Sequence, residues 1–355
     1  GIQPADVILE IDGQPTVGME LSEAVKRIVG PLGTNVRLRI GRDDGQKVEL
    51  NVTRGTINLP TVKGIRRGTD NSWDFVLDAE HKLGYVSVVQ FGATTVQEMR
   101  AAIELLKQLG AKGLILDLRF CPGGTLEAAV GVAKLFLSSG TIVTLHSRSG
   151  EPTTIKADAP GTAGEIPVMV LVNGQTASAA EVLAGALQDN QRALVLGTRT
   201  VGKGSVQTLI KLEDGSGAIK LTTAQYRLPS GRNIDKRVGE KSWGIDPDDG
   251  YFIPLESAQT KALLAERQRR EIIGKTSAAP PNEKANDPQL AAALRSLTAK
   301  LQTGTFAKVS TLSAAQIELF LKRDEIERRR ESAAEALTKI DRELAELKPE
   351  SPAKN

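Results

Sequence analysis

A serine, a lysine and a glutamine lie close enough in the sequence to suggest nucleophilic catalysis. Ser178 stands at the start of a helical pattern that follows the apolar run 168–172 and the turn 173–175. Lys203 follows in a Gly-Lys-Gly loop, and Gln207 comes four residues later. A neutral lysine can accept a serine proton if burial lowers the lysine pKa, because the ammonium group loses hydration. A glutamine can orient the amine without adding a negative charge that would keep it protonated. The pattern therefore predicts an activated hydroxyl nucleophile.

Acyl transfer by such a nucleophile also needs hydrogen-bond donors for an oxyanion. The stretch 117–124, DLRFCPGG, ends a continuous apolar strand pattern and opens a helical one. Glycines at a helix N-terminus present free N–H groups and the positive end of the helix dipole. Gly123 and Gly124 are therefore candidate oxyanion donors, and a simple strand-to-helix turn remains the alternative.

Two simpler interpretations compete with this chemistry. Ser178 and Glu181 fit a capping box, in which the serine caps the helix and the glutamate reaches back to it. The stretch 197–203, GTRTVGK, is close to a phosphate-binding Walker A loop. That loop needs Ser or Thr immediately after the lysine and a helix beyond, whereas Gly204 and an alternating strand pattern follow here. The context therefore disfavours a nucleotide site.

Other catalytic classes have weaker signals. His81 and His146 leave a Ser-His-Asp triad as an alternative, although no motif places either of them beside Ser178. Cys121 has no histidine in a recognisable partner motif, which disfavours a cysteine nucleophile. The sequence has no HExxH motif, paired CxxC or carboxylate cluster, so we expect neither a metal nor another cofactor.

Composition places the chain among ordinary globular proteins. It has 355 residues, enough for two or three domains, with 40% hydrophobic and 25% charged residues. A net charge of +3 and 3% aromatic residues do not favour nucleic-acid binding. The single cysteine excludes an internal disulfide framework, and no apolar run approaches the ~18 residues of a spanning helix. Because the chain starts at Gly1, we expect a fragment or processed form whose upstream signal or membrane anchor is missing.

Periodicity predicts three structured regions. Residues 1–55 read as a small α+β domain with a strand, a helix and two strands. The region 56–274 alternates strands and helices between residues 84 and 197, which predicts a mostly parallel sheet covered on its faces. A linker at 275–288 precedes a helical region, 289–355. The individual elements are strands at 6–12, 35–40, 47–52, 84–91, 113–118, 168–172 and 193–197, helices at 22–29, 95–109, 125–137, 288–301 and 313–347 with another that begins near 176, and hairpins at 141–156 and 205–228.

Three stretches together resemble the C-terminal processing proteases, or tail-specific proteases, of peptidase family S41. They are DLRFCPGG, TASAAE and GTRTVGKGSVQ, and the similarity continues through TTAQYRLPSGRNI and GIDPDD. Ser178 and Lys203 are 25 residues apart, the separation that the family shows. The resemblance covers roughly residues 1–300 and leaves the tail from about 303 unexplained. Cys121 departs from the family, which usually has Asn before Pro-Gly-Gly.

The resemblance implies a role for each matched residue. Ser178 would be the nucleophile, Lys203 the general base and Gln207 the residue that orients the lysine. The oxyanion would be bound by the backbone N–H groups of Gly123 or Gly124 and of Ala179, the residue after the serine.

The resemblance also implies an α/β core of the crotonase or Clp-protease kind carrying a PDZ domain. The stretch GIQPADVILEIDG and the pattern after it resemble the second half of a bacterial PDZ domain, with Ala5 where glycine is usual. PDZ domains add an extended C-terminal peptide to a sheet edge. The carboxylate-binding loop would precede Gly1, so no residue is assigned to it, and a generic α+β module remains the alternative.

The expected function is that of a serine endopeptidase that cleaves proteins with apolar, unstructured C-terminal tails through an acyl-enzyme. A non-catalytic scaffold that binds tails through a PDZ domain is the alternative. The expected location is extracytoplasmic, in a bacterial periplasm or at a membrane. The charge run KRDEIERRRE, from Lys322, favours a solvated helix face over an arm for a second copy or an adaptor.

Overall fold

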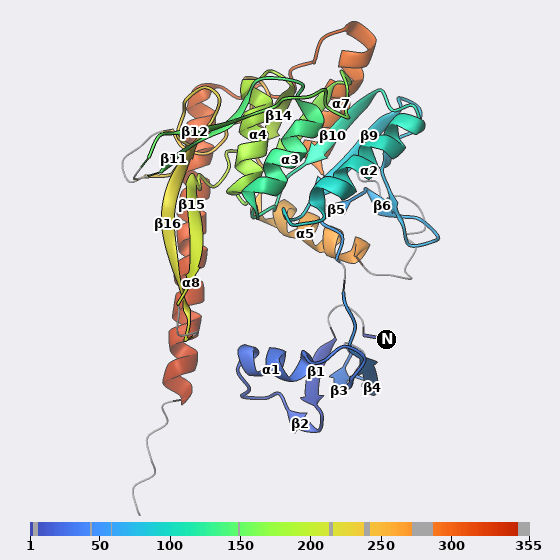
Figure 1. The fold of residues 1–355 in the computed structure, drawn as a ribbon, viewed down its shortest axis with the longest axis vertical. Helices are drawn as coiled ribbons and strands as arrows, with labels where there is room; N and C mark the ends of the chain where they lie inside the picture. The colour runs from blue at the N-terminus through green and yellow to red at the C-terminus, as the bar shows by residue number, and fades with distance from the viewer. Residues whose placement is uncertain are drawn as a thin grey trace, which may run out of the picture. The chain divides into compact units, whose positions relative to one another are not determined.

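The computed structural model describes residues 1–2, 6–42, 45–57, 59–147, 150–212, 216–237, 242–271 and 287–346. The chain divides into two compact units (Figure 1). The first comprises Gly1–Pro60, Arg66–Trp73 and Lys261–Pro281, and the second comprises Thr61–Ile65, Asp74–Thr260 and Asn282–Asn355. Each unit is described by itself.

The first unit contains a four-stranded sheet with the order β2-β1-β3-β4. Its alternating apolar residues, among them Val36, Leu38 and Ile40, share one face and form a small buried core with Ile11. The predicted order of strand, helix and two strands is confirmed, while Asp43 and Asp44 of the expected turn lie outside the described residues. The bounds are β1 Val7–Ile11, β2 Gln14–Pro15, α1 Leu21–Ile28, β3 Asn35–Gly41 and β4 Lys47–Thr53.

The second unit is built on a sheet whose main path runs β14-β13-β10-β9-β5. The strands β9, β10, β13 and β14 are mutually parallel, which confirms the predicted parallel sheet, and the short strand β8 pairs with β9. The bounds are β5 Val62–Lys63, β8 Val76–Asp78, β9 Leu83–Val88, β10 Gly113–Asp117, β13 Val168–Val172 and β14 Ala193–Gly197.

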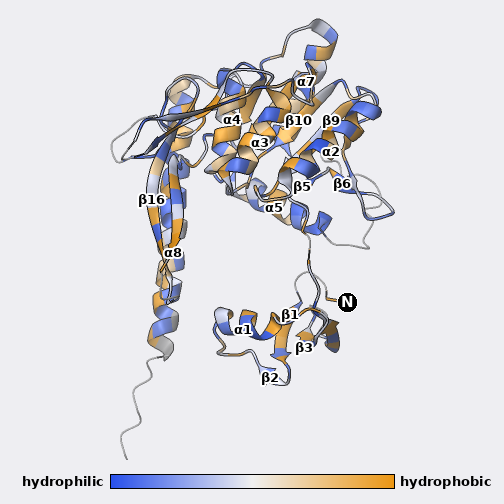
Figure 2. Cartoon of the chain, in the orientation of Figure 1, coloured by the Kyte–Doolittle hydropathy of each residue, from blue (hydrophilic) through white to orange (hydrophobic). Residues whose placement is uncertain are grey.

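Helices cover both faces of this sheet because its strands are apolar on both sides. Leu114 and Leu116 pack into the core beneath α2 (Thr95–Gln108), α3 (Leu126–Phe136) and α4 (Ala179–Asp189). Ile115, between them in sequence, joins the opposite core with Leu290 and Leu294 of α7 (Pro288–Thr303). Figure 2 shows the hydrophobic residues concentrated in β10, α3 and α4.

A second, antiparallel sheet has the order β12-β11-β16-β15. Both predicted hairpins are present, although Asp214 and Gly215 of the second turn lie outside the described residues. The pairing of β11 with β16, which joins the two hairpins, had no signal in the sequence. The bounds are β11 Thr141–Ser147, β12 Thr153–Lys156, β15 Ser205–Lys211 and β16 Ala218–Arg227.

The remaining elements were predicted unevenly. Helix α8 (Ala314–Glu346) matches its prediction, whereas β6 (Arg66–Arg67), β7 (Trp73–Asp74) and α5 (Ser257–Arg270) were not predicted. Helix α5 buries only Leu263, so it carries no apolar stripe that a periodicity argument could detect. The predicted linker lies outside the described residues except for 287 and 288. Across the described residues, none of the helices has the length and apolar character needed to cross a membrane.

Candidate active site

Three loops meet at one edge of the parallel sheet. The glycine loop (118–124) follows β10, the serine turn (173–178) follows β13, and the lysine loop (198–204) follows β14. These strands are neighbours in the order β14-β13-β10 and run in the same direction. Their carboxyl ends therefore lie together, which is the edge where open α/β sheets place ligand sites.

Ser178 occupies a strained backbone position at the start of α4. Its φ of 57° and ψ of −121° are sparsely populated for a residue with a side chain. Its N–H donates to Glu181 Oε2 at 2.7 Å, so the glutamate half of the capping box is formed. The side chain is partly exposed. A sharp strand-to-helix turn of this kind holds a serine at the surface, where a substrate can reach its hydroxyl group.

The glycine loop approaches the serine closely at Gly123. This residue has a φ of +94°, and a Cβ atom there would lie 2.9 Å from Ser178 Cβ and 3.0 Å from Ala179 N. Only glycine permits this contact. Ala179 is the first residue of α4, so its N–H has no acceptor within the helix. The structure therefore places the backbone of Gly123 beside Ser178 and Ala179.

Gly124 makes a different contact. Its φ is +142°, and a Cβ atom there would lie 2.0 Å from the carbonyl oxygen of Phe91. The two residues form an isolated β-bridge. Of the two candidate glycines, Gly123 lies beside the serine and Gly124 packs against the segment after β9.

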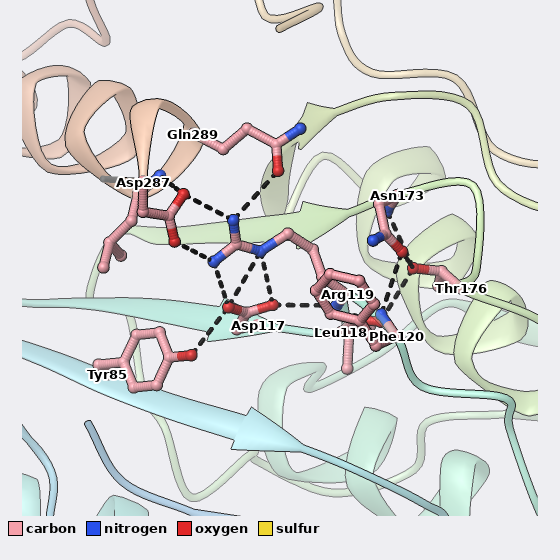
Figure 3. Close-up of polar contacts among 10 residues, drawn as sticks. Tyr85, Asp117, Leu118, Arg119, Phe120, Asn173, Thr176, Asp287 and Gln289 are labelled. Carbon is pink, nitrogen blue, oxygen red and sulfur yellow. Dashed lines mark hydrogen bonds and ion pairs between the residues drawn. The ribbon is translucent and has the colours of Figure 1, made fainter. Parts of the chain in front are cut away.

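The serine turn and the glycine loop are joined by side-chain and backbone hydrogen bonds (Figure 3). Three cross between them: Phe120 N–H to Asn173 Oδ1 at 3.0 Å, the Thr176 hydroxyl to the Leu118 carbonyl at 2.9 Å, and Ala177 N–H to the Cys121 carbonyl at 3.0 Å. Phe120, which donates the first of these bonds, has a positive φ of 65°. The two loops therefore form one connected structure around Ser178.

Cys121 is a buried thiol in this loop. Its side chain is fully inaccessible, and burial raises its pKa to about 12, with a hydrogen bond from the Gly123 N–H acting in the opposite direction. A group with that pKa is almost entirely protonated at neutral pH, so it lacks the thiolate that attacks substrates. The buried thiol thus gives no support to Cys121 as a nucleophile.

The lysine loop is anchored through its backbone. Lys203 N–H donates to Glu181 Oε2 at 2.9 Å, and the Lys203 carbonyl accepts a hydrogen bond from the Tyr226 hydroxyl. Val201 N–H also donates to the Thr176 carbonyl of the serine turn at 3.0 Å. The loop that carries the predicted base is thereby fixed beside the loop that carries the predicted nucleophile.

The side chains of Lys203 and Gln207 are not brought to the serine. Both residues are exposed, and among the described residues no hydrogen bond joins the Lys203 amine to Ser178. This differs from the expectation that burial would desolvate the lysine. Both backbone groups of Lys203 are bound to buried partners, so its side chain is left on the solvent side of the loop.

Tyr226 is a site residue that sequence reasoning missed. It lies on β16 and is 2% exposed, and an interaction with the Ser178 side chain partly offsets the rise of its pKa. Burial raises its pKa, so its hydroxyl group stays protonated and can donate to the Lys203 carbonyl. Its strand was predicted, but its place beside Ser178 depends on the pairing of β16 with β11.

The histidines lie elsewhere. His81 Nδ1 is 3.1 Å from Asp78 Oδ2 in the turn before β9, and His146 lies on β11 opposite Gln225. Within the described ranges, neither forms a hydrogen bond with Ser178, and no cluster of three or more metal-binding side chains is found. The structure places the glycine loop and Tyr226 beside the serine instead.

A buried ionic cluster supports the base of the glycine loop (Figure 3). Arg119, 1% exposed, lies between two carboxylates: Asp117, at the end of β10, and Asp287, which caps α7. Its Nη2 is 2.7 Å from an oxygen of each. Gln289 accepts a further bond from Arg119, and the Tyr85 hydroxyl donates to Asp117 at 2.8 Å. The cluster therefore ties α7 to the root of the glycine loop.

We expect Arg119→Leu to lower the free energy of unfolding by about 3–5 kcal/mol, because it leaves two buried carboxylates without their cation. Urea titration followed by circular dichroism measures the change. Arg323→Leu is the matched control, since its ion pair with Glu256 is exposed and should contribute about 0–1 kcal/mol. Equal, small losses in the two variants would show that the buried cluster does not stabilise the fold.

Comparison with known proteins identifies the family. A model of peptidase family S41 matches residues 82–250. A carboxyl-terminal-processing protease of Synechocystis sp. is 41% identical over 259 residues, which are 72% of this chain and 57% of that protein. A carboxy-terminal-processing protease of Bartonella bacilliformis is 33% identical over 323 residues, covering 86% of this chain and 70% of that protein.

A solved structure, the photosystem II D1 C-terminal processing protease, is 31% identical with a TM-score of 0.46 and covers 72% of this chain and 64% of that one. The chain spans little more than half the length of the Synechocystis protein described above. The Bartonella relative is matched over more than two thirds of its length at 33% identity. By this match to the Bartonella protein, the chain belongs to peptidase family S41, and carboxyl-terminal processing proteases are its relatives.

Proposed function

We propose that this protein is a serine endopeptidase that uses Ser178 as nucleophile and Lys203 as general base. The observation that carries the proposal is the close approach of Gly123 to Ser178 and Ala179, with the lysine loop hydrogen-bonded to the same turn. A strained serine, two candidate oxyanion donors and a lysine then share one edge of the sheet. This arrangement has the parts that acyl transfer requires.

In the proposed reaction, the Ser178 oxygen attacks a peptide carbonyl carbon while the neutral Lys203 amine accepts the hydroxyl proton. The N–H groups of Gly123 and Ala179 donate to the oxyanion. When the tetrahedral intermediate collapses, the C–N bond breaks and the lysine ammonium returns the proton to the leaving amine. Water then attacks the acyl-enzyme while the lysine amine takes a proton from it; the ester C–O bond breaks, the new carboxyl end is released, and the lysine ammonium returns the proton to the Ser178 oxygen.

Substrate binding would shield the Lys203 amine from water. Lys203 is exposed in this structure, whereas a base of this kind works best when water is excluded from the amine. A peptide lying across the lysine loop would cover the amine and strengthen every local electrostatic interaction. Catalytic hydrogen bonds often tighten only once substrate is bound. We assign Gln207 the role of orienting the amine in that complex.

The proposed substrates are proteins with apolar, unstructured C-terminal tails, consistent with the processing role in the names of the relatives. The first unit would bind such tails as the C-terminal portion of a PDZ domain, and the second would have a crotonase-like or Clp-protease-like core. We place the protein outside the cytoplasm, with α8 available to a second copy or an adaptor. A scaffold that binds tails without cleaving them is the competing function.

The test is to incubate the complete chain with a reduced, carboxymethylated protein that carries an apolar C-terminal tail, and to identify products by mass spectrometry. We expect internal cleavage that depends on time and enzyme concentration. The same protein with a charged tail is the control and should be cleaved more slowly. Binding of the apolar tail without any product would instead favour the scaffold.

A further inference from the structure

Glu181 is an acidic residue whose burial a helix cap does not explain. It is the third residue of α4 and is 0% exposed. A capping box needs only its hydrogen bond to the N–H of Ser178, which is 2.7 Å long. The carboxylate accepts three further hydrogen bonds, all from the lysine loop: from the Thr200 hydroxyl, from Gly202 N–H at 2.7 Å and from Lys203 N–H at 2.9 Å.

The four donors are divided between the two oxygens. Oε1 accepts from Thr200 and Gly202, and Oε2 accepts from Ser178 and Lys203. An ionised carboxylate has only acceptor sites, so it can satisfy all four donors, whereas a protonated acid or an amide cannot. Because Ser178 and Lys203 share one oxygen, their backbone nitrogens can be no farther apart than two hydrogen-bond lengths.

An ionised Glu181 carboxylate in this buried position lowers the stability of the fold. Burial raises the pKa of Glu181 because the charged form loses hydration, and the four hydrogen bonds counter part of that effect. A folded-state pKa above the unfolded value means that ionised Glu181 lowers stability at neutral pH relative to its protonated form. The residue therefore needs a reason beyond stability, and the loops that it joins suggest one.

We propose that Glu181 is a positioning residue that holds the lysine loop in register with Ser178 for acyl transfer. This inference rests on the proposed function of the same site. Glu181 acts through the backbone of Ser178 and Lys203 and has no contact with substrate in the mechanism above. A displacement of a reacting group by about 1 Å can cost about 100-fold in rate. A loop joined to the nucleophile through one shared oxygen is protected from such displacement.

Other contacts, which do not involve Glu181, would still hold the lysine loop if Glu181 were substituted. The Thr200 hydroxyl accepts a hydrogen bond from Ile245 N–H at 2.7 Å, and the Gly202 carbonyl accepts one from Lys236 N–H at 2.9 Å. Trp243 packs against Gly202, where an added Cβ would lie 2.6 Å from Trp243 Cδ1. Loss of Glu181's charge should therefore loosen residues 200–204 without unfolding the surrounding structure.

Glu181→Gln tests the proposal, because glutamine keeps the shape and replaces one acceptor oxygen with a donating NH₂ group. We expect kcat to fall about 100-fold with little change in KM, and hydrogen exchange of peptides spanning residues 198–204 to become faster. Glu104→Gln, an exposed glutamate on α2, is the control and should leave both measurements unchanged. Thr200→Val, which removes one donor, should give a smaller change in both and serves if Glu181→Gln fails to fold.

Two outcomes separate this inference from the function on which it rests. If Ser178→Ala is inactive while Glu181→Gln retains the wild-type kcat and exchange rate, Glu181 does not position the loop and the peptidase assignment stands. If Ser178→Ala remains active, the peptidase mechanism itself is wrong. Faster exchange in Glu181→Gln with unchanged kcat would also overturn the proposal, because it would show that loop position does not limit the reaction.

Discussion

Replacing Ser178 by alanine is expected to lower kcat/KM by on the order of 10⁴-fold or more, because no other atom of the site can form the acyl-enzyme. The change deletes one hydroxyl oxygen and leaves the backbone bond from residue 178 to Glu181 in place. The fold should therefore persist. The measurement is cleavage of the unfolded, tail-bearing substrate by mass spectrometry, with circular dichroism to confirm folding.

Ser138→Ala is the matched control, since Ser138 is exposed after α3 and lies outside the three site loops. It should retain wild-type activity. Undiminished cleavage by a folded Ser178→Ala protein would overturn the assignment of the nucleophile and, with it, the roles given to Gly123 and Ala179.

Lys203→Arg is expected to be nearly as inactive as Lys203→Ala, because a guanidinium cannot be deprotonated at working pH. In wild type, kcat/KM should rise with pH, because a general base acts only in its deprotonated form. A histidine base would instead give a rise centred near pH 6.5.

The pH profile is decisive when it is repeated in His81→Gln and His146→Gln. We expect the step to survive in both variants, because neither histidine is hydrogen-bonded to Ser178 among the described residues. If either change erases the activity and the pH step while folding is preserved, a histidine triad replaces the serine–lysine mechanism. An active Lys203→Arg protein would contradict the mechanism in the same way.

Local pattern was sufficient for the elements of the second unit that carry the site. The apolar runs at 113–118 and 168–172 are strands in the structure, and the helical stripe at 95–109 is α2. These predictions succeed because strand and helix periodicity are properties of neighbouring residues. The parallel order of strands follows from their alternation with helices, so the edge where the three loops meet could also be expected.

Residue type and spacing singled out Ser178 and the glycines Gly123 and Gly124, whereas Ala179 was expected only from the family resemblance; the structure places Gly123 beside Ser178 and Ala179. Glycine is required where two backbones approach closely, and a sequence displays that requirement directly. Glu181 was visible only as a helix-capping residue, because a capping box is a contact between residues three positions apart. Its bonds to Thr200, Gly202 and Lys203 span about 20 residues and have no periodic signature.

The sequence by itself thus determined the order of the strands and helices that carry the site and the need for a glycine at position 123, and it nominated the residues proposed for the chemistry. The tertiary structure decided which residues distant in sequence lie around the site. Tyr226 comes close to Ser178 because β16 pairs with β11, and Arg119 forms an ion pair with Asp287, which is 168 positions away. It also decided that the Lys203 side chain is exposed while its backbone is bound inward. The physical reason is that hydrogen-bond partners of buried polar groups are set by how sheets and helices pack, and local sequence carries no record of that packing.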